Sequence, residues 1–473
     1  MHFDTLPEII QGGMGIGVSG WPLAKAVALN GQLGVVSGTA LDNVLIRRLQ
    51  DGDFEGHVRR AMEQFPIPDV AQEVLDRFFK PEGREEGEPY RLAPMYRQVV
   101  DNFRNQVTVL GNFVEVWLAK EGHDGEVGIN YLTKLQMPTL SSIYGAMLAG
   151  VDYVLMGAGI PREIPGALDR FCNHEPATIR LDVQGNGDCD DARLEFDPKA
   201  GWDGDLPPLK RPKFLPIIAS NSLATMMAKK ANGRVDGFII EGPTAGGHNA
   251  PPRGDLTLNE KGEPLYGDKD VVNLEKLSRL GLPFWRAGGT GYPGQVKETK
   301  DAGGAGIQVG TLFAYCEESG LDPELKRQVI ELCNNGGVEV LTDGRASPTG
   351  FPFKVVELES SLTEEKVYED RKRVCDLGYL RTAYRRDDGR INFRCAAEPV
   401  GTFLKKGGDE ADTKGRKCLC NALMANIGMG QHRKDGTQEL PLLTSGDELK
   451  KLGAFLNGRE SYTAKDVIDY LLS

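Results

Sequence analysis

The stretch GFIIEGPTAGGH, residues 237–248, indicates the class of fold because it joins a short apolar run to a glycine-rich loop. Two later runs, FWRAGG at 284–289 and GIQVGT at 306–311, also end in small residues. Parallel strands that are covered on both faces read as nearly continuous apolar runs. The three runs therefore predict parallel strands of an α/β protein, each followed by a loop that exposes backbone N–H groups.

Five runs of the same kind precede these three along the chain. Stretches with helical character lie between the runs, so the chain repeats one strand-and-helix unit eight times. A closed (β/α)8 TIM barrel is the most economical architecture for eight such units. The five earlier runs are EIIQGGM (8–14), LGVVSG (33–38), EVGINYL (126–132), VDYVLMG (151–157) and FLPIIAS (214–220).

Three insertions lengthen the barrel, which we assign to residues 1–358. The first, about 42–125, has apolar positions at helical intervals and predicts a helical subdomain or lid. The second, 161–212, predicts a β-hairpin whose acidic tip is QGNGDCDD (184–191). The third, 249–270, is rich in Pro, Gly and charge, and is a candidate cover for a site beside it.

Beyond residue 358 the alternation of strands and helices ends. The segment 359–473 holds charged helical patterns, a polar stretch and a final amphipathic run, AKDVIDYLLS. We expect a C-terminal, mostly helical extension that packs on the barrel.

Composition narrows the class of protein. The 473 residues include 56 Lys plus Arg against 68 Asp plus Glu, a formal charge of -12, with no basic block. Nucleic acid and anionic membranes need clustered positive charge, so neither is the expected partner. The N-terminal run has no signal-peptide pattern, and Asp152 interrupts the longest apolar stretch. We expect a cytoplasmic enzyme with a small-molecule substrate. The sequence leaves the oligomeric state open, and a homo-oligomer is one of the alternatives.

Residues 15–20, GIGVSG, match the dinucleotide-binding pattern G-x-G-x-x-G. A Rossmann unit also needs an acidic residue at the end of its second strand, but Asp42 lies beyond that strand. GTGYPG at 289–294 matches the same pattern, so the pattern discriminates little in a chain with 59 glycines. We therefore reject a Rossmann unit.

The ends of the last two predicted strands carry Gly288, Gly289, Gly310 and Thr311. Barrel loops need glycine for their turns in any case. However, barrels often bind phosphate with backbone amides after strands seven and eight. We therefore predict a phosphate site at these residues.

His248 follows Thr-Ala-Gly-Gly at the carboxyl end of the sixth predicted strand, which is the catalytic face of a barrel. A lone histidine is usually a hydrogen-bonded structural residue. This one is among only six in the chain, and the glycines before it, such as Gly247, allow a ligand to approach the backbone. We predict that His248 acts as a catalytic base.

The motifs IIQGGMGIGVS, GIN (128–130), EGPTAGGH, RAGGTGY and IQVGTLF, in this order, resemble the flavin-dependent nitronate monooxygenases. The resemblance covers most of residues 6–355. Flavin-type enoyl-acyl-carrier-protein reductases share the same barrel and motifs. The resemblance implies FMN across the barrel mouth, with its phosphate on Gly288, Gly289, Gly310 and Thr311. It also places Gln11, Gly12, Gly13 and Met14 near the flavin ring, Asn130 on the ring's polar edge, and His248 as the base.

Three functions remain open at this point. The first is oxidation of nitronates or nitroalkanes with oxygen, in which His248 handles the proton. The second is NAD(P)H-dependent reduction of an enoyl thioester on the same scaffold. The third, from another class, is a non-catalytic flavin-binding regulator that uses the tail for interactions.

Four cysteines lie in the tail: Cys375, Cys395, Cys418 and Cys420. The close pair KCLC could join two distant thiols around zinc or an iron–sulfur cluster. The spacing matches no standard signature, so the sequence favours ordinary buried thiols and no metal.

Overall fold

The centre of the molecule is a barrel of parallel strands. The computed structural model describes residues 6–185, 192–200, 202 and 204–473. Eight parallel strands follow one another in the order β1-β11-β10-β9-β8-β4-β3-β2. A parallel bridge between Ile10 and Leu33 joins the two ends of this sheet, so the predicted TIM barrel is confirmed. The strands are β1 (Ile9–Gln11), β2 (Gly34–Ser37), β3 (Val127–Leu132), β4 (Tyr153–Gly157), β8 (Lys213–Ile218), β9 (Phe238–Glu241), β10 (Phe284–Ala287) and β11 (Gly306–Val309).

Side chains from most of the strands fill the barrel interior, so it is a packed core and not a pore. Trp285 of β10 is completely buried there, and its indole N–H donates to the carbonyl of Pro7 at 2.7 Å. Alternate residues of the same strands face the surrounding helices and are buried as well. This double burial explains why the strands read as continuous apolar runs. The interior cluster contains Ile10, Leu33, Val35, Tyr153, Leu155, Leu215, Ile239, Trp285, Ala287 and Ala305.

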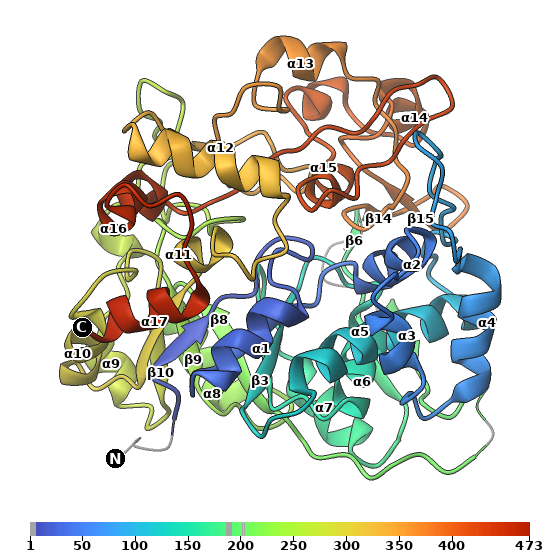
Figure 1. The fold of residues 1–473 in the computed structure, drawn as a ribbon, viewed down its shortest axis with the longest axis horizontal. Helices are drawn as coiled ribbons and strands as arrows, with labels where there is room; N and C mark the ends of the chain where they lie inside the picture. Colours follow the sequence, from blue (N-terminus) through green and yellow to red (C-terminus); the bar gives the residue numbers. More distant parts are fainter. Residues whose placement is uncertain (1–5, 186–191, 201, 203) are drawn as a thin grey trace.

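Helices surround the barrel and connect its strands (Figure 1). Ser220 caps the helix after β8, because its hydroxyl accepts from the backbone N–H of Leu223. The helix after β9 begins in the same way, at Asn273. The connecting helices are α1 (Trp21–Leu29), α6 (Thr139–Leu148), α7 (Ile164–Phe171), α8 (Asn221–Lys230), α9 (Leu274–Ser278) and α10 (Gln295–Asp301), with α11 (Thr311–Ala314) and α12 (Pro323–Asn334) after β11.

The insertion after β2 is helical. It forms α2 (Leu41–Gln50), α3 (His57–Met62), α4 (Pro68–Phe78) and α5 (Asn102–Lys120), drawn in blue and teal in Figure 1. The long helix α5 packs against α6 and α1 of the barrel, and α2 to α4 pack on α5. The insertion therefore extends the core of the barrel sideways.

The second insertion contains an antiparallel pair, β5 (Ala177–Arg180) with β7 (Arg193–Phe196). Most of the acidic tip expected between them, residues 186–191, lies outside the described residues. The short strand β6 (Val183–Gln184) pairs with a tail strand instead. The third insertion has little regular structure beyond η2 (Asp268–Asp270), and it exposes Leu256, Leu258 and Leu265.

The tail mixes short helices with strands, and is less helical than expected. A hairpin, β12 (Val340–Asp343) with β13 (Phe353–Val356), precedes it. A second hairpin forms around the turn DDG at 387–389, because the residues on both sides alternate and the turn needs glycine. The tail elements are α13 (Glu365–Asp370), β14 (Thr382–Arg385), β15 (Ile391–Arg394), α14 (Val400–Lys405), η3 (Glu410–Thr413), α15 (Leu419–Ala425), η4 (Asp447–Lys451), α16 (Leu452–Leu456) and α17 (Ala464–Leu472).

The tail contacts the rest of the chain at several places. Helix α17 packs beside α1, α10 and α11, as Figure 1 shows in red. The segment around Tyr379 reaches the helical insertion, where its hydroxyl donates to the buried carboxylate of Asp42. Within the part of the chain that the structure describes, no helix is long and apolar enough to cross a membrane.

Candidate functional site

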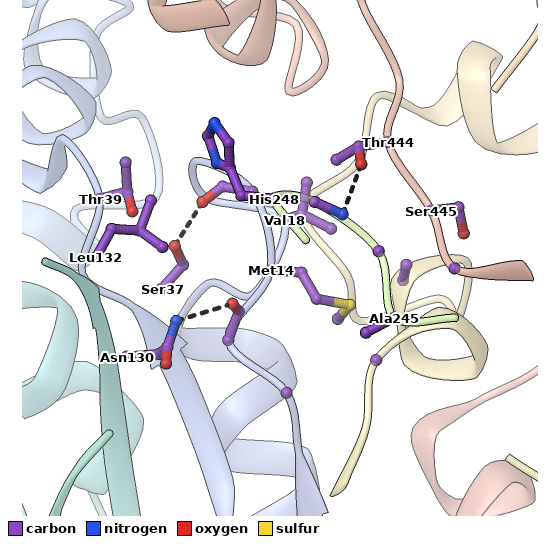
Figure 2. Close-up of a pocket in the computed structure, with 18 of the residues that line it drawn as sticks. Met14, Val18, Ser37, Thr39, Asn130, Leu132, Ala245, His248, Thr444 and Ser445 are labelled. Carbon is purple, nitrogen blue, oxygen red and sulfur yellow. Dashed lines mark hydrogen bonds between the residues drawn. The ribbon is translucent and has the colours of Figure 1, made fainter. Parts of the chain in front are cut away.

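A cavity opens at the carboxyl ends of the barrel strands (Figure 2). Every strand contributes to its wall, either with one of its last two residues or with the loop directly after it. Carboxyl ends of parallel strands meet at one rim, which is where barrel enzymes carry their active sites. The residues from the strand ends are Gly12, Ser37, Leu132, Gly157, Ile217, Glu241, Ala287 and Gln308.

Three of the four residues predicted to bind phosphate line this cavity: Gly288, Gly310 and Thr311. Gly289 is next to them but does not line it. Gly288 has φ +79°, and a Cβ there would lie 3.0 Å from the backbone nitrogen of Ala245. Only glycine fits this left-handed, crowded position easily. The loop after β10 therefore presents bare backbone to the cavity.

Of the residues predicted to contact a flavin ring, Gly12, Gly13, Met14 and Asn130 line the cavity. Gly13 leaves no room for a side chain, because a Cβ would lie 2.5 Å from the Cβ of Asn130. Figure 2 shows the amide of Asn130 donating to the carbonyl of Gly13. These residues bring the end of β3 against the loop after β1.

Gln11 does not line the cavity, so its predicted contact with the ring is not seen. Its side chain lies behind the loop, completely buried. The amide nitrogen donates to the hydroxyl of Ser19 at 2.9 Å, and the amide oxygen accepts from the backbone N–H of Val35 at 2.9 Å. Gln11 therefore supports the backbone of the loop.

His248 lines the cavity, and its loop is held from two sides. Its Nε2 lies 2.7 Å from the hydroxyl of Ser347, and its ring packs edge-on against Phe353 at 4.8 Å. The neighbouring Gly247 also lines the cavity, and its N–H donates to Thr444 at 2.9 Å, as Figure 2 shows. The imidazole is thus positioned by contacts with residues far away in the sequence.

Burial and the nearby ammonium of Lys134 lower the pKa of His248 to about 3. The imidazole is therefore neutral at physiological pH. No residue of the predicted cover, 249–270, lines the cavity.

Two charged residues near His248 were not predicted from the sequence. Glu241, the last residue of β9, lines the cavity, and burial raises its pKa to about 7. Burial lowers the pKa of Lys134 to about 7 as well, although Glu241 opposes this shift. The Lys134 Nζ has no hydrogen-bond partner among the described residues and lies 3.2 Å from the centre of the Phe351 ring.

The tail supplies a further part of the wall. Thr444, Ser445 and Gly446 line the cavity, and the N–H of Gly446 donates to the Thr311 hydroxyl at 3.1 Å. The carboxylate of Glu448 accepts from the backbone N–H of Gly291 in the loop after β10. A carboxylate bound there shows that the amides of this loop attract acidic oxygen atoms. The small residues of TSG (444–446) were the only sequence signal for this contact.

Three buried polar atoms of residues that line the cavity have no hydrogen-bond partner among the described residues. They are the hydroxyl oxygen of Ser445 and the amide oxygens of Asn130 and Gln308. Buried acceptors of this kind normally have a partner, so a ligand with N–H groups would satisfy them. Fold and cavity together define a (β/α)8-barrel protein with a glycine-lined ligand pocket at its carboxyl face.

Residues 209–347 match the family model for nitronate monooxygenase. This match confirms the resemblance drawn from the motifs. A probable nitronate monooxygenase of Staphylococcus haemolyticus (strain JCSC1435) is 30% identical over 123 residues, which are 26% of this chain and 33% of the relative. A probable nitronate monooxygenase of Bacillus subtilis (strain 168) is 30% identical over 97 residues, which are 20% of this chain and 26% of that relative. The matches thus span about a third or less of these curated relatives.

Two solved structures align with nearly the whole chain. FabK from Thermotoga maritima has 15% sequence identity and a TM-score of 0.48, with 99% of this chain and 92% of that chain covered. Nitroalkane oxidase from Streptomyces ansochromogenes has 14% sequence identity and a TM-score of 0.46, with 99% of this chain and 95% of that chain covered.

Proposed function

We propose that this protein is an FMN-dependent oxidoreductase that oxidises nitronates with oxygen, with His248 as its base. The observation that carries the proposal is the placement of one neutral imidazole on the same cavity as the glycine loops after β10 and β11. The family match over residues 209–347 supports the same reaction class.

The residues present fit FMN. Gly288, Gly310 and Thr311 would hold the phosphate with their backbone N–H groups, as helix starts and glycine loops do. The buried amide oxygens of Asn130 and Gln308 would accept from the N–H groups of a flavin ring. FMN, when bound, supplies the electron transfer between substrate and oxygen.

The charges of the cavity favour a nitronate over its neutral nitroalkane. A base with a pKa of about 3 is too weak to remove a proton from a neutral carbon acid efficiently. A nitronate has already lost that proton, and its negative charge is attracted by the Lys134 ammonium. An anion close to His248 also raises the pKa of the imidazole, so that it can take up a proton during turnover.

Anaerobic addition of substrate to the flavin-loaded protein tests this proposal. A nitronate is expected to bleach the flavin absorbance, and oxygen to restore it. NADPH is expected to leave the spectrum unchanged in a parallel sample. Bleaching by NADPH followed by reoxidation with an enoyl thioester would instead establish the reductase, and tight flavin binding without either reaction would indicate a regulator.

The KM for a nitronate is expected to rise as the pH increases through about 7. Below that pH Glu241 is neutral and Lys134 is charged, whereas above it Glu241 is charged and Lys134 is neutral. The pair therefore changes from a net positive to a net negative charge, which repels the anionic substrate. His248 stays neutral over this range.

Initial rates between pH 6 and 8.5 would measure this effect, with Glu241→Gln as the test variant. The glutamine removes the charge that appears above pH 7, so its KM should rise less steeply. The exposed residue Glu275, replaced by Gln, is a control that should keep the original profile. Equal slopes for the two variants would contradict the assigned role of Glu241.

A further inference from the structure

Four cysteines from separate parts of the tail meet at one small cavity. Cys375 follows α13, Cys395 follows β15, and Cys418 and Cys420 lie at the start of α15. All four line this cavity, together with Arg381. They are half of the eight cysteines of the chain. Their sequence spacing matched no metal-binding signature, but the fold brings them together.

The four thiols lie around the same cavity, and Cys375, Cys395 and Cys418 are each near enough to Cys420 to interact with it electrostatically. Cys395 and Cys418 form a small buried cluster with Ala397, separate from the large apolar cores. All are free thiols, as are the other cysteines that the structure describes. Ordinary core packing does not require four sulfur atoms around one cavity.

The spacing distinguishes a single metal ion from a cluster. A tetrahedral zinc ion, with Zn–S bonds of about 2.3 Å, needs sulfur atoms within about 4 Å of one another. Among the described residues, no three His, Cys, Asp or Glu side chains converge closely enough to hold one ion. The four cysteines instead line one cavity together, and the thiolate ligands of an iron–sulfur cluster bind different iron atoms and so lie farther apart than the ligands of one ion.

We propose that Cys375, Cys395, Cys418 and Cys420 bind an iron–sulfur cluster through four Fe–S bonds. Each thiol loses its proton as its bond to iron forms. Cationic neighbours would offset the negative charge of the ligated cluster. Arg381 lines the cavity, and Arg371 lies close enough to Cys418 to lower the pKa of that thiol.

The cluster would lie next to the larger cavity of the barrel. Leu380, Leu419 and Cys420 line both cavities, so only a thin wall separates them. The metal site does not depend on the proposed function, because it rests on the tail cysteines alone. Electron exchange between the cluster and a flavin would rest on that function.

Metal and sulfide analysis tests the proposal. The full-length protein is purified without oxygen and reconstituted with iron and sulfide before the analysis. Iron and acid-labile sulfide are expected in equal amounts, about two or four of each per chain. Reduction with dithionite should produce an electron paramagnetic resonance signal, independent of any activity. Absence of iron, one zinc ion per chain, or a disulfide among the four cysteines would overturn the proposal.

The double variant Cys418→Ser/Cys420→Ser is expected to lose the iron and the signal. Cys172→Ser is the matched control, because Cys172 lies at the end of α7, far from this cavity in the sequence, and should keep both. Iron content of the double variant equal to that of the control would contradict the assignment. If the double variant does not fold, the analysis of the unmodified protein still decides the question.

Discussion

Replacement of His248 by alanine is expected to lower kcat for nitronate oxidation by about 10²–10⁴-fold, the usual contribution of a general base or acid. The imidazole is neutral, and its Nε2 is held by the hydroxyl of Ser347 at 2.7 Å. No other imidazole lines the cavity among the described residues. Flavin content should change little, because the predicted phosphate loops follow β10 and β11.

Steady-state and anaerobic half-reactions would separate these effects for His248→Ala. His57→Ala is the matched control, since His57 pairs with the exposed Glu55 and lies outside the cavity. Ser347→Ala should affect kcat less than His248→Ala, because Ser347 acts only by positioning the ring. A His248→Ala enzyme with the kcat of the unmodified protein would refute the assigned base.

Replacement of Asp42 by alanine is expected to cost about 3–5 kcal/mol in the free energy of unfolding, the cost of leaving a buried charge unpaired. The Asp42 carboxylate lies 2.5 Å from the guanidinium of Arg104, with side-chain exposures of 2% and 3%. It also accepts from the hydroxyl of Tyr379, which lines the cavity. Arg104 belongs to the helical insertion, as Asp42 does, so the Tyr379 hydrogen bond is the contact that joins the insertion to the tail.

Urea unfolding of Asp42→Ala would measure the loss directly. The surface pair Glu275–Arg279, 76% and 70% exposed, offers a matched control. Glu275→Ala should change the stability by no more than about 1 kcal/mol. Equal midpoints for the two variants would show that the buried Asp42 carboxylate contributes nothing to the stability of the fold.

The barrel could be predicted because each strand has a local signal in the sequence. Both faces of β9 and β10 are buried, so their apolar character is continuous in the sequence. Gly288 and Gly310 were predicted for the same reason, because they follow directly after strands. The position of His248 on the cavity was predicted from its place at the end of a glycine loop.

The rest of the site depends on contacts that have no local signal. Thr444 meets Gly247 across 197 positions of the chain. Glu241 ends a strand, where a carboxylate usually faces solvent, and only the fold shows that it lies near enough to Lys134 to interact with it electrostatically. Gln11 does not line the cavity although its neighbours do, because its amide bonds to the residues behind them.

The position of the bound flavin phosphate is the most direct test of the proposed FMN site. A crystal structure of the protein with FMN bound is predicted to place the phosphate within hydrogen-bond distance of the backbone nitrogens of Gly288, Gly310 and Thr311. A phosphate bound away from the loops after β10 and β11, or FMN outside the cavity, would contradict the account.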